Sequence, residues 1–390
     1  MSKNSIPAVR FCDFSDNWES KKIGDLGSVS MNKRIFKDET SETGEVPFYK
    51  IGTFGSEPDS FITREKFEEY KSKYPYPEIG DILISASGSI GRTVEYHGEE
   101  AYFQDSNIVW LKHDERLNNS FLKQFYSIVK WEGIEGTTIK RLYNKNILET
   151  PISFPSPAEQ SAIGTLFRTL DDLLSSYKDN LANYQSLKAT MLSKMFPKAG
   201  QTVPEIRLDG FEGEWEEKEF IQIVNRVTES SDSDSLPKVE FEDIISGQGK
   251  LNKDISSKFD NRKGILFKPG YTLYGKLRPY LNNWLLPKFE GVALGDFWVF
   301  DPNGNNSDFI YYLVQSSRYQ KVANDTSGTK MPRSDWKSVS TTIFAIPQTI
   351  AEQQAIGAYF SNLDNLINSY QEKISQLETL KKKLLQDMFI

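Results

Sequence analysis

The sequence AEQSAIGTLFRTLDDLLSSYKDNLANYQSLKATMLSKMF, from Ala158 to Phe196, recurs from Ala351 to Phe389 as AEQQAIGAYFSNLDNLINSYQEKISQLETLKKKLLQDMF. The copies align without a gap at a constant offset of 193 residues, and 17 of the 39 aligned pairs are identical. Chance similarity between two helices would not keep one register over this length. The duplication therefore predicts a chain built from two related halves.

Both copies are predicted to form long helices, because apolar residues recur at alternating spacings of three and four, as in a coiled-coil seam. A helix of 39 residues would be about 58 Å long, so each is expected to act as a spacer. The seam positions are Ile163, Leu166, Leu170, Leu173, Tyr177, Tyr184, Leu187 and Met191 in the first copy, and Ile356, Tyr359, Leu363, Leu366, Tyr370, Leu377, Leu380 and Leu384 in the second. Asn180 and Lys373 interrupt the two seams at equivalent positions, which fits either a register device or an ordinary amphipathic helix.

A second repeat lies ahead of the first. PAVRFCDFSDNWESK, from Pro7 to Lys21, matches PEIRLDGFEGEWEEK, from Pro204 to Lys218, at an offset of 197 residues. Because the two offsets are so close, the material between the repeats differs in length by only 4 residues. Each half is therefore expected to consist of a short aromatic lead-in, a globular segment and a long helix.

We expect an α+β fold with a pseudo-twofold internal repeat, in which two tandem α/β domains are separated by two long antiparallel coiled-coil helices. The expected segments are residues 1–157 for the first domain with its lead-in, 158–196 for the first helix, 197–214 for a linker rich in proline and glycine, 215–350 for the second domain, and 351–390 for the second helix.

Short strands bounded by turn residues are predicted in both globular segments. In the first, VPFYKIGTFG, GDILISASGSIGRTVEY and AYFQDSNIVWLK are strand-like, and NSFLKQFYSIVKW is a helix with Asn119 and Ser120 as possible caps. In the second, SDFIYYLVQSSRYQKVA is predicted to be one helix. The two segments end alike, with GTTIKRL from Gly136 and GTKMPR from Gly328.

Composition restricts the class of protein. One cysteine, Cys12, excludes a disulfide framework and suits a reducing cytoplasm. No apolar run approaches the roughly 20 residues of a membrane span, and no signal peptide is evident, so we expect a soluble cytoplasmic protein. With only His97 and His113 beside that cysteine, we expect no His/Cys metal site. The net charge of −7 argues against a simple nucleic-acid binder, although local clusters decide this point.

Basic residues gather at two places. Thr137 to Leu148 carries Lys140, Arg141 and Lys145 without an acidic residue, and its counterpart in the second half has Lys330 and Arg333. These turns either bind phosphates or are simply solvated. Lys250 to Arg278 carries a local balance of +6, interleaved with Tyr271, Tyr274 and Tyr280. The eight basic residues there are Lys250, Lys253, Lys258, Arg262, Lys263, Lys268, Lys276 and Arg278, against Asp254 and Asp260. Such a cluster is typical of a nucleic-acid surface, and the alternative is a solubilising face.

Two further patterns leave their role open. GSIGR, from Gly88 to Arg92, is glycine-rich but lacks the lysine and spacing of a P-loop, so it predicts a tight turn with Arg92 exposed or in contact with nucleic acid. Lys276 and Arg278 would project from one face of a strand, where they could contact guanine edges or phosphates. No Walker loop, nuclease cluster or methyltransferase motif is present, which favours a binding protein over an enzyme.

Taken together, these motifs resemble the specificity subunit of type I restriction-modification systems over almost the whole chain. The resemblance rests on the duplicated AEQ..AIG..F..LD.L...Y pattern, the GDIL of Gly80 to Leu83, the YGKLRPYL of Tyr274 to Leu281, the GTTIKRL and GTKMPR turns, and the two lead-ins. The first lead-in, RFCDFSDNW, is degenerate relative to RLDGFEGEW.

The resemblance implies that each domain recognises one half of a bipartite site on double-stranded DNA, and that the helices fix the gap and bind two modification (methyltransferase) subunits, to which restriction subunits can be added. It also implies that this chain has no catalytic residues and binds no metal or cofactor, since S-adenosylmethionine, ATP and Mg are used by the partner subunits. The alternatives are a coiled-coil interaction scaffold that never contacts DNA, and a self-contained DNA-modifying enzyme.

The residues expected to contact DNA are Arg92, Thr137, Lys140, Arg141, Lys145, Lys263, Lys276, Arg278, Tyr280, Lys330 and Arg333. The helix residues expected to bind partner subunits are Leu170, Tyr177, Leu187, Leu363, Tyr370 and Leu380. The divergent middles of the two halves predict two different half-sites, whereas identical domains would predict a palindrome.

Overall fold

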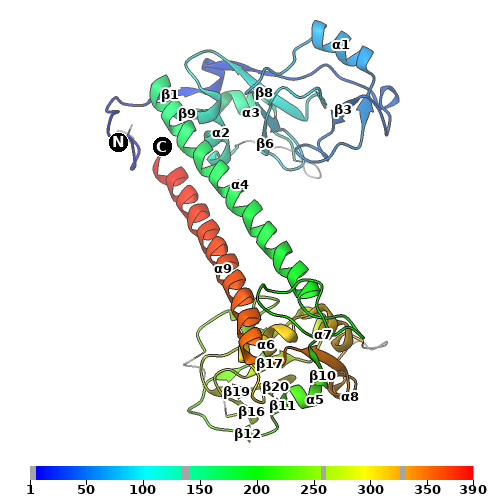
Figure 1. Cartoon of the computed structure of the whole chain (residues 1–390). Helices are drawn as coiled ribbons and strands as arrows, with labels where there is room; N and C mark the ends of the chain where they lie inside the picture. The colour runs from blue at the N-terminus through cyan, green and yellow to red at the C-terminus, as the bar shows by residue number, and fades with distance from the viewer. Residues whose placement is uncertain (1–5, 133–139, 256–260, 326–330, 390) are drawn as a thin grey trace. The chain divides into compact units, whose positions relative to one another are not determined.

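The computed structural model describes residues 6–132, 140–255, 261–325 and 331–389 of the chain (Figure 1). It consists of two compact units, the first formed by residues 1–177 with 373–390 and the second by residues 178–372. The two long helices are α4 (Pro157–Lys194) and α9 (Ile350–Asp387). Each unit therefore contains one domain, the beginning of one long helix and the end of the other.

The first unit has a four-stranded antiparallel sheet in the order β2-β8-β5-β6, a three-stranded sheet β4-β3-β7 and the pair β1-β9. Its strands are β1 (Glu19–Lys22), β2 (Gly27–Ser30), β3 (Val46–Tyr49), β4 (Phe61–Ile62), β5 (Ile82–Ser85), β6 (Thr93–Glu95), β7 (Tyr102–Phe103), β8 (Ile108–His113) and β9 (Pro151–Phe154). Its shorter helices are η1 (Ile23–Asp25), η2 (Lys37–Glu39), α1 (Arg64–Lys73), α2 (Asn119–Ile128) and α3 (Asn144–Glu149).

The second unit has a corresponding four-stranded sheet β11-β20-β17-β18 and pair β10-β21, but its second sheet, β12-β16-β19-β13, has four strands, and it has a further pair, β14-β15. Its strands are β10 (Glu216–Glu219), β11 (Asn225–Arg226), β12 (Ser230–Ser231), β13 (Lys238–Val239), β14 (Ile244–Ile245), β15 (Lys250–Leu251), β16 (Gly264–Phe267), β17 (Thr272–Gly275), β18 (Trp284–Leu285), β19 (Gly291–Ala293), β20 (Phe297–Asp301) and β21 (Ile343–Ile346). Its shorter helices are α5 (Phe220–Ile223), η3 (Phe241–Asp243), η4 (Pro279–Leu281), α6 (Ser307–Leu313), α7 (Ser317–Ala323) and α8 (Trp336–Ser340).

Each long helix begins by packing on its own domain. Glu159 accepts hydrogen bonds from Arg10 Nε at 2.7 Å and Nη2 at 2.6 Å, and Glu352 accepts from Arg207 Nε at 2.7 Å and Nη2 at 2.9 Å. These side-chain hydrogen bonds raise the pKa of both guanidinium groups. The lead-in arginine of each half is therefore joined to the first turn of the helix that ends the half.

The residue after each glutamate extends the attachment. Gln160 accepts from the backbone N–H of Asn118 at 2.9 Å, and Gln353 accepts from that of Asn306 at 2.9 Å, so each glutamine holds the N-terminus of a domain helix, α2 or α6. The helix also lies so close to the domain at Gly164 that an added Cβ would be 1.9 Å from Ser120 Oγ, which leaves no room for a side chain. The shared AEQ..AIG pattern is thus the docking surface of a helix on its domain.

The far end of each long helix completes the unit that contains the start of the other (Figure 1). In the first unit, Phe389 stacks on Phe121 at a centroid distance of 5.1 Å. In the second, Phe196 lies 5.8 Å from Phe309 and 6.0 Å from Phe360. Both contacts bury apolar area in a domain core, so neither unit is complete without residues from the distant helix end.

Within each unit the paired helix segments run antiparallel and share an ion pair. In the second unit Lys188 Nζ lies 2.6 Å from Asp364 Oδ1, and in the first unit Lys381 pairs with Asp171. These two pairs occupy equivalent positions of the repeat, 193 residues apart. The internal repeat of the sequence is therefore also a repeat of side-chain contacts.

Several sequence-based expectations are corrected in detail. The helix surface buried in the first unit runs through Ile163, Phe167, Leu170 and Leu174, whereas Leu173 is 40% exposed. The predicted seam includes Ile163 and Leu170 but omits Phe167 and Leu174, because the first turns pack on a domain with a period near 3.6 residues, not on a partner helix with a period of 3.5. The two compact units each include part of both long helices, since α4 is divided after Tyr177 and α9 after Glu372.

Two shorter helices also differ from expectation. Helix α2 begins at Asn119 with Asn118 as its N-cap, since the Asn118 side chain accepts from the Ser120 N–H at 2.8 Å. The single helix predicted from Ser307 to Ala323 is two helices, α6 and α7, because the Ser316 side chain caps the second of them by accepting from the Tyr319 N–H. A capping serine satisfies N–H groups that have no intrahelical partner, which favours a new helix start.

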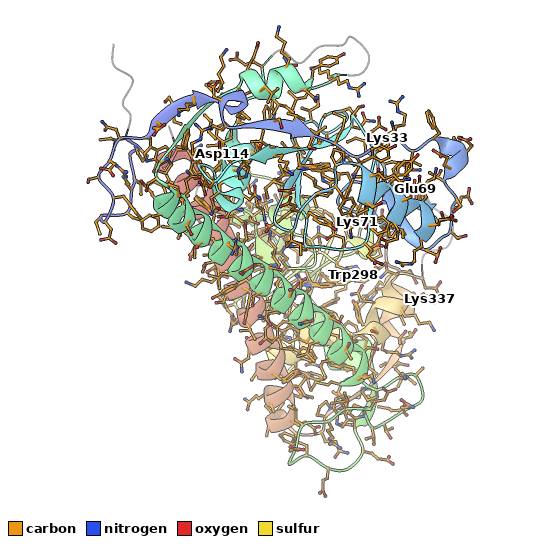
Figure 2. All side chains as sticks on the ribbon, turned by 90° about the horizontal axis from the view of Figure 1, so that it is seen from above. Lys33, Glu69, Lys71, Asp114, Trp298 and Lys337 are labelled. Atoms are coloured by element: carbon orange, nitrogen blue, oxygen red, sulfur yellow. The ribbon has the colours of Figure 1, made fainter. Side chains whose placement is uncertain are left out.

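Helix α1 distinguishes the first domain, since no helix fills that place in the second domain where the structure describes it. Lys71 of α1 lies 5.1 Å from the ring centroids of Phe67 and Tyr76, and Lys33 lies 5.2 Å from that of Tyr74 (Figure 2). These cation–π contacts and the ring packing hold the added helix on its domain. Along the described parts of the chain, no helix is both long and apolar enough to cross a membrane.

The two buried glutamates allow a matched test of helix docking. Glu352 also accepts from Trp215 Nε1 at 3.1 Å, whereas Trp18 Nε1 has no hydrogen-bond partner in the described structure. We expect Glu352→Ala to lower the free energy of unfolding by about 3 kcal/mol, because it removes the carboxylate that pairs with the half-buried Arg207 and leaves the Trp215 N–H without an acceptor. Glu159→Ala should lower the free energy of unfolding by about 1 kcal/mol less than Glu352→Ala does, because no tryptophan N–H loses its acceptor in this variant. Urea denaturation of both variants, followed by tryptophan fluorescence, measures the difference, and an equal or reversed order would contradict this account.

Candidate nucleic-acid interface

Three loops meet at one end of the main sheet in the second unit. In the loop after β17, the backbone N–H of Lys276 donates to Asp296 O at 2.9 Å, and that of Arg278 donates to Pro332 O at 2.7 Å. The backbone N–H of Ser334 in turn donates to Lys276 O at 2.9 Å. An isolated bridge joins Leu277 to Arg333. This backbone network brings together loops that are 20 to more than 50 residues apart in sequence. We call it the second loop junction.

Asp296 organises the charges of the second loop junction. Its carboxylate accepts from Arg333 Nε at 3.2 Å and Nη2 at 3.0 Å, and Lys276 Nζ lies 3.8 Å away. The side-chain hydrogen bonds raise the pKa of the Arg333 guanidinium. One carboxylate thus orients two cations, and the junction keeps a net positive charge because Arg278 adds a third.

Arg278 occupies an unusual backbone conformation, with φ 48° and ψ 62° in the left-handed region. Its guanidinium has no hydrogen-bond or ion-pair partner among the described residues, and Tyr280 of the same turn is 58% exposed. A non-glycine residue in this region is strained, and such strain concentrates at functional sites. The turn therefore presents an available arginine and an available aromatic ring to solvent.

The first unit contains an equivalent junction with different chemistry. Ser87 is bridged to Arg141, Leu142 N donates to Ala86 O at 2.8 Å, and Ala86 N donates to Asn107 O at 2.7 Å. Asn107 stands where the second unit has Asp296, so no carboxylate is aimed at the arginine from this position. Arg141 instead donates from Nη2 to the carbonyl of Ser106 at 3.2 Å. We call this the first loop junction.

The hairpin turns of the two junctions also differ. Gly88 and Gly91 take φ values of 64° and 83° in the first unit, whereas Arg278 and Asn282 take 48° and 55° in the second. Glycine adopts this conformation at no steric cost. The position that carries Arg278 in the second turn is therefore matched in the first turn by a glycine without a side chain.

The structure brings together some of the predicted contact residues. Lys276, Arg278, Tyr280 and Arg333 share the second loop junction, and Arg141 lies in the first. Lys140 is the exposed neighbour of Arg141, and the exposed Arg92 donates to Gly55 O at 3.1 Å.

Other predicted contact residues lie apart from the two junctions. Lys145 lies on α3, 4.0 Å from Glu149, and Lys263 precedes β16 in the second sheet. Thr137 and Lys330 fall outside the residues that the structure describes.

The basic cluster of Lys250 to Arg278 is less positive than its sequence indicates. Lys253 Nζ lies 2.8 Å from Asp243 Oδ1, Arg262 pairs with Glu240, and Lys276 is near Asp296. All three acids lie outside the sequence window, so a count along the chain could not include them. The local balance of +6 is therefore partly neutralised by the fold.

Sequence reasoning missed Asp296 and Asn107. Both lie just before a central strand, and no motif marks them as junction residues. The one available signal was the shared GTTIKRL and GTKMPR turns, which do place Arg141 and Arg333 at equivalent positions.

The predicted partner-binding helix residues differ in exposure. Leu170 and Leu363 are each 8% exposed and lie in the cores of their own units. Tyr177, Leu187 and Tyr370 are partly exposed, and Leu380 is 45% exposed. Burial makes the first two side chains inaccessible as they stand, so the prediction for this set rests on the remaining four.

The structure arranges no group of three or more His, Cys, Asp or Glu side chains as a metal site within its described ranges. Both ring nitrogens of His113 are in hydrogen-bond contact, Nδ1 with Asp114 O at 2.7 Å and Nε2 with Asn119 Oδ1 at 2.7 Å. The chemistry available at the loop junctions is that of cations, amides and hydroxyls, which bind phosphates and base edges.

Comparison with known proteins gives a family match in both halves. A model described as the type I restriction modification DNA specificity domain matches residues 15–183 and 215–379. A putative type I restriction enzyme specificity subunit from Haemophilus influenzae is 53% identical over 161 residues, which is 41% of this chain and 42% of that protein. The chain therefore spans less than half the length of that relative.

Two other comparisons extend over nearly the whole chain. The specificity subunit of the type I restriction enzyme MjaVIII from Methanocaldococcus jannaschii is 20% identical over 405 residues, covering 95% of this chain and 91% of that protein. The crystal structure of a type I restriction-modification S subunit from M. genitalium matches with a TM-score of 0.61 at 16% identity, covering 99% of both chains. At this identity the structural match shows the fold alone.

The role of Asp296 can be tested by removing its charge. We expect Asp296→Asn to leave Lys276 and Arg333 unneutralised. The slope of log binding constant against log salt concentration, measured with random-sequence duplex DNA, should therefore become steeper by about one unit. Asp234→Asn is a matched control, because it makes the same change at an exposed position of the same unit. Fluorescence anisotropy over a salt series measures both slopes, and identical slopes would argue against this role.

Proposed function

The chain belongs to the type I restriction-modification DNA specificity family, and we propose that its two domains recognise the two halves of one asymmetric, bipartite DNA site. The chain is a DNA-recognition subunit and not itself an enzyme. The family match covers both halves, which disfavours the alternative of a scaffold that never contacts DNA.

One observation supports two different half-sites, namely the chemical contrast between equivalent loop junctions. The second junction offers Lys276, Arg278 and Arg333 around a single carboxylate, whereas the first offers Arg141 beside Asn107 and Ser87. Arginine and lysine bind guanine edges and phosphates, while asparagine suits adenine. Two domains with one backbone plan and different side chains would select different bases.

We further propose that the two long helices set the distance between the half-sites and bind two modification (methyltransferase) subunits, with restriction subunits as further partners. Joining two weak DNA-binding domains raises the effective concentration of the second once the first is bound. The partner subunits would carry the chemistry with S-adenosylmethionine, ATP and Mg. We place this complex in the cytoplasm, which suits a chain with one unpaired cysteine.

The proposed function is tested by expressing the chain with its modification subunit in a host free of DNA methylation. Modified adenines are then mapped by single-molecule sequencing. A split, asymmetric motif with a fixed gap is the expected result. An active modification subunit that yields no such motif would overturn the proposal and favour the scaffold alternative.

Arg278 is expected to contribute to sequence readout. If it contacts a base, Arg278→Ala should cost about 1–3 kcal/mol of binding free energy and relax the motif at one position. If it contacts a phosphate, affinity should fall equally for all sequences. The control is Lys321→Ala, an exposed lysine of the same unit on α7. Titration against a panel of sites with single substitutions separates these cases, and unchanged affinity with an unchanged motif would remove Arg278 from the interface.

The spacer role of the helices is tested by length. Inserting four helical residues after Asn180 adds about 6 Å to α4. We expect the insertion to lengthen the gap in the methylated motif or to abolish modification, while both half-site sequences remain the same. A changed half-site sequence would show that the helix does more than set the distance. The insertion variant and the wild-type chain are compared by the same methylation mapping.

A further inference from the structure

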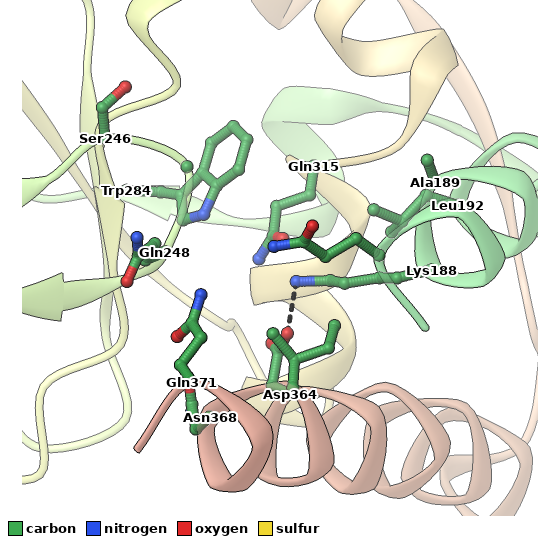
Figure 3. A pocket seen from close by; sticks show the side chains of 13 residues that line it. Lys188, Ala189, Leu192, Ser246, Gln248, Trp284, Gln315, Asp364, Asn368 and Gln371 are labelled. Atoms are coloured by element: carbon green, nitrogen blue, oxygen red, sulfur yellow. Dashed lines mark hydrogen bonds and ion pairs between the residues drawn. The ribbon is translucent and has the colours of Figure 1, made fainter. Parts of the chain in front are cut away.

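The second unit contains a cavity of about 340 Å³ between its domain and the two helix segments (Figure 3). This volume lies at the lower end of the range for small-molecule sites, about 300–1,000 Å³. Its lining includes Gln185, Lys188, Gln248, Trp284, Asn368 and Gln371. All of them belong to one compact unit, and they come from α4, α9 and the domain.

Trp284 lines this cavity, and its indole N–H is buried in the cavity wall. The residue is 6% exposed, and its indole N–H has no partner among the described atoms. Figure 3 shows the indole nitrogen turned toward the space between the helices and the domain. A tryptophan N–H can only donate, and a buried donor without a partner is costly. A ligand that presents an acceptor would remove this cost.

The charges around the cavity cancel within its wall. Lys188 Nζ lies 2.6 Å from Asp364 Oδ1, and the Tyr312 hydroxyl donates to Asp364 Oδ2 at 2.8 Å. Most of the remaining polar groups are carboxamides, including those of Gln185, Gln248 and Gln371. A carboxamide offers two donors beside an acceptor and carries no charge. This lining favours an uncharged ligand with donors and acceptors of its own.

The internal repeat shows that helix pairing does not require these carboxamides. The ion pair of Lys188 and Asp364 recurs in the other half of the repeat as Lys381 and Asp171. The carboxamides do not recur, since Glu378 replaces Gln185, Lys178 replaces Gln371 and Ser175 replaces Asn368. The three helix carboxamides of the lining are therefore not a conserved feature of the internal repeat.

We propose that this cavity binds an uncharged planar molecule with hydrogen-bond donors and acceptors along one edge, the chemistry of a nucleobase or nucleoside. Asparagine and glutamine carboxamides pair with such an edge through two hydrogen bonds, as they do with adenine. The Trp284 N–H would donate to a ring nitrogen or carbonyl of the ligand. The Lys188 and Asp364 pair stays intact in the wall and disfavours phosphorylated ligands, because no unneutralised cation is directed at a phosphate from this pair.

The cavity is also connected to the second loop junction, and this part of the inference rests on the proposed function. Gly247, in the cavity wall, donates from its backbone N–H to Asn282 O at 3.0 Å, and the Ser246 hydroxyl donates to Leu281 O. A molecule held against this turn would stabilise the hairpin that carries Arg278. By linkage, DNA bound at that hairpin would in turn tighten binding of the molecule.

The test is isothermal titration calorimetry of the full chain with adenosine, guanosine, cytidine and thymidine separately, without DNA. We expect saturable binding of at least one nucleoside. Gln371→Lys and Gln185→Glu introduce residue types that the other half already carries at equivalent positions, so both variants should keep the melting temperature. Each should weaken binding by about tenfold or more.

The control is Asn365→Lys, which changes an exposed residue of α9 outside the cavity and should leave binding unchanged. The assignment is overturned if none of the four nucleosides binds saturably, or if both glutamine variants bind as the wild type does. Neither result depends on DNA recognition, so the proposed function would stand. If a nucleoside binds but leaves DNA affinity unchanged, the site stands and its connection to the hairpin falls.

Discussion

A buried glutamate at the start of each long helix is the constraint on which the rest of the structure depends. Glu159 and Glu352 are 1% and 4% exposed, and a carboxylate at that depth requires a charged partner. Arg10 and Arg207 provide it from lead-ins about 150 residues earlier in the chain. This pairing fixes the lead-in and the first helical turn together, while the adjacent glutamine and the nearby glycine bring a domain helix close. Each domain is thereby held rigidly on the helix that follows it.

The far ends of the helices add a second level of dependence. Phe389 completes the core of the first unit and Phe196 that of the second, so each unit needs a segment from the other half of the chain. The equivalent ion pairs of Asp171 with Lys381 and of Lys188 with Asp364 show that both ends use one packing solution.

The two domains differ most at positions where the shared backbone does not depend on a particular side chain. The backbone bridges of the loop junctions recur in both units, whereas Asp296 and Asn107 differ in charge, and Arg278 and Gly88 differ in both charge and reach. The carboxamides around the second-unit cavity follow the same rule. The two domains therefore share a duplicated backbone frame and differ in the side chains of their loops.

The sequence by itself determined the duplication, the two long helices and the family, because these depend on residue spacing that survives in linear order. It also located Arg141 and Arg333 at equivalent places through the shared turns. Only the tertiary structure decided which acids neutralise the basic cluster, which stripe of the helix is buried, and that Asp296 and Trp284 face a junction and a cavity. Those features arise from contacts between segments tens to hundreds of residues apart, and no local pattern encodes which distant side chain a loop will meet.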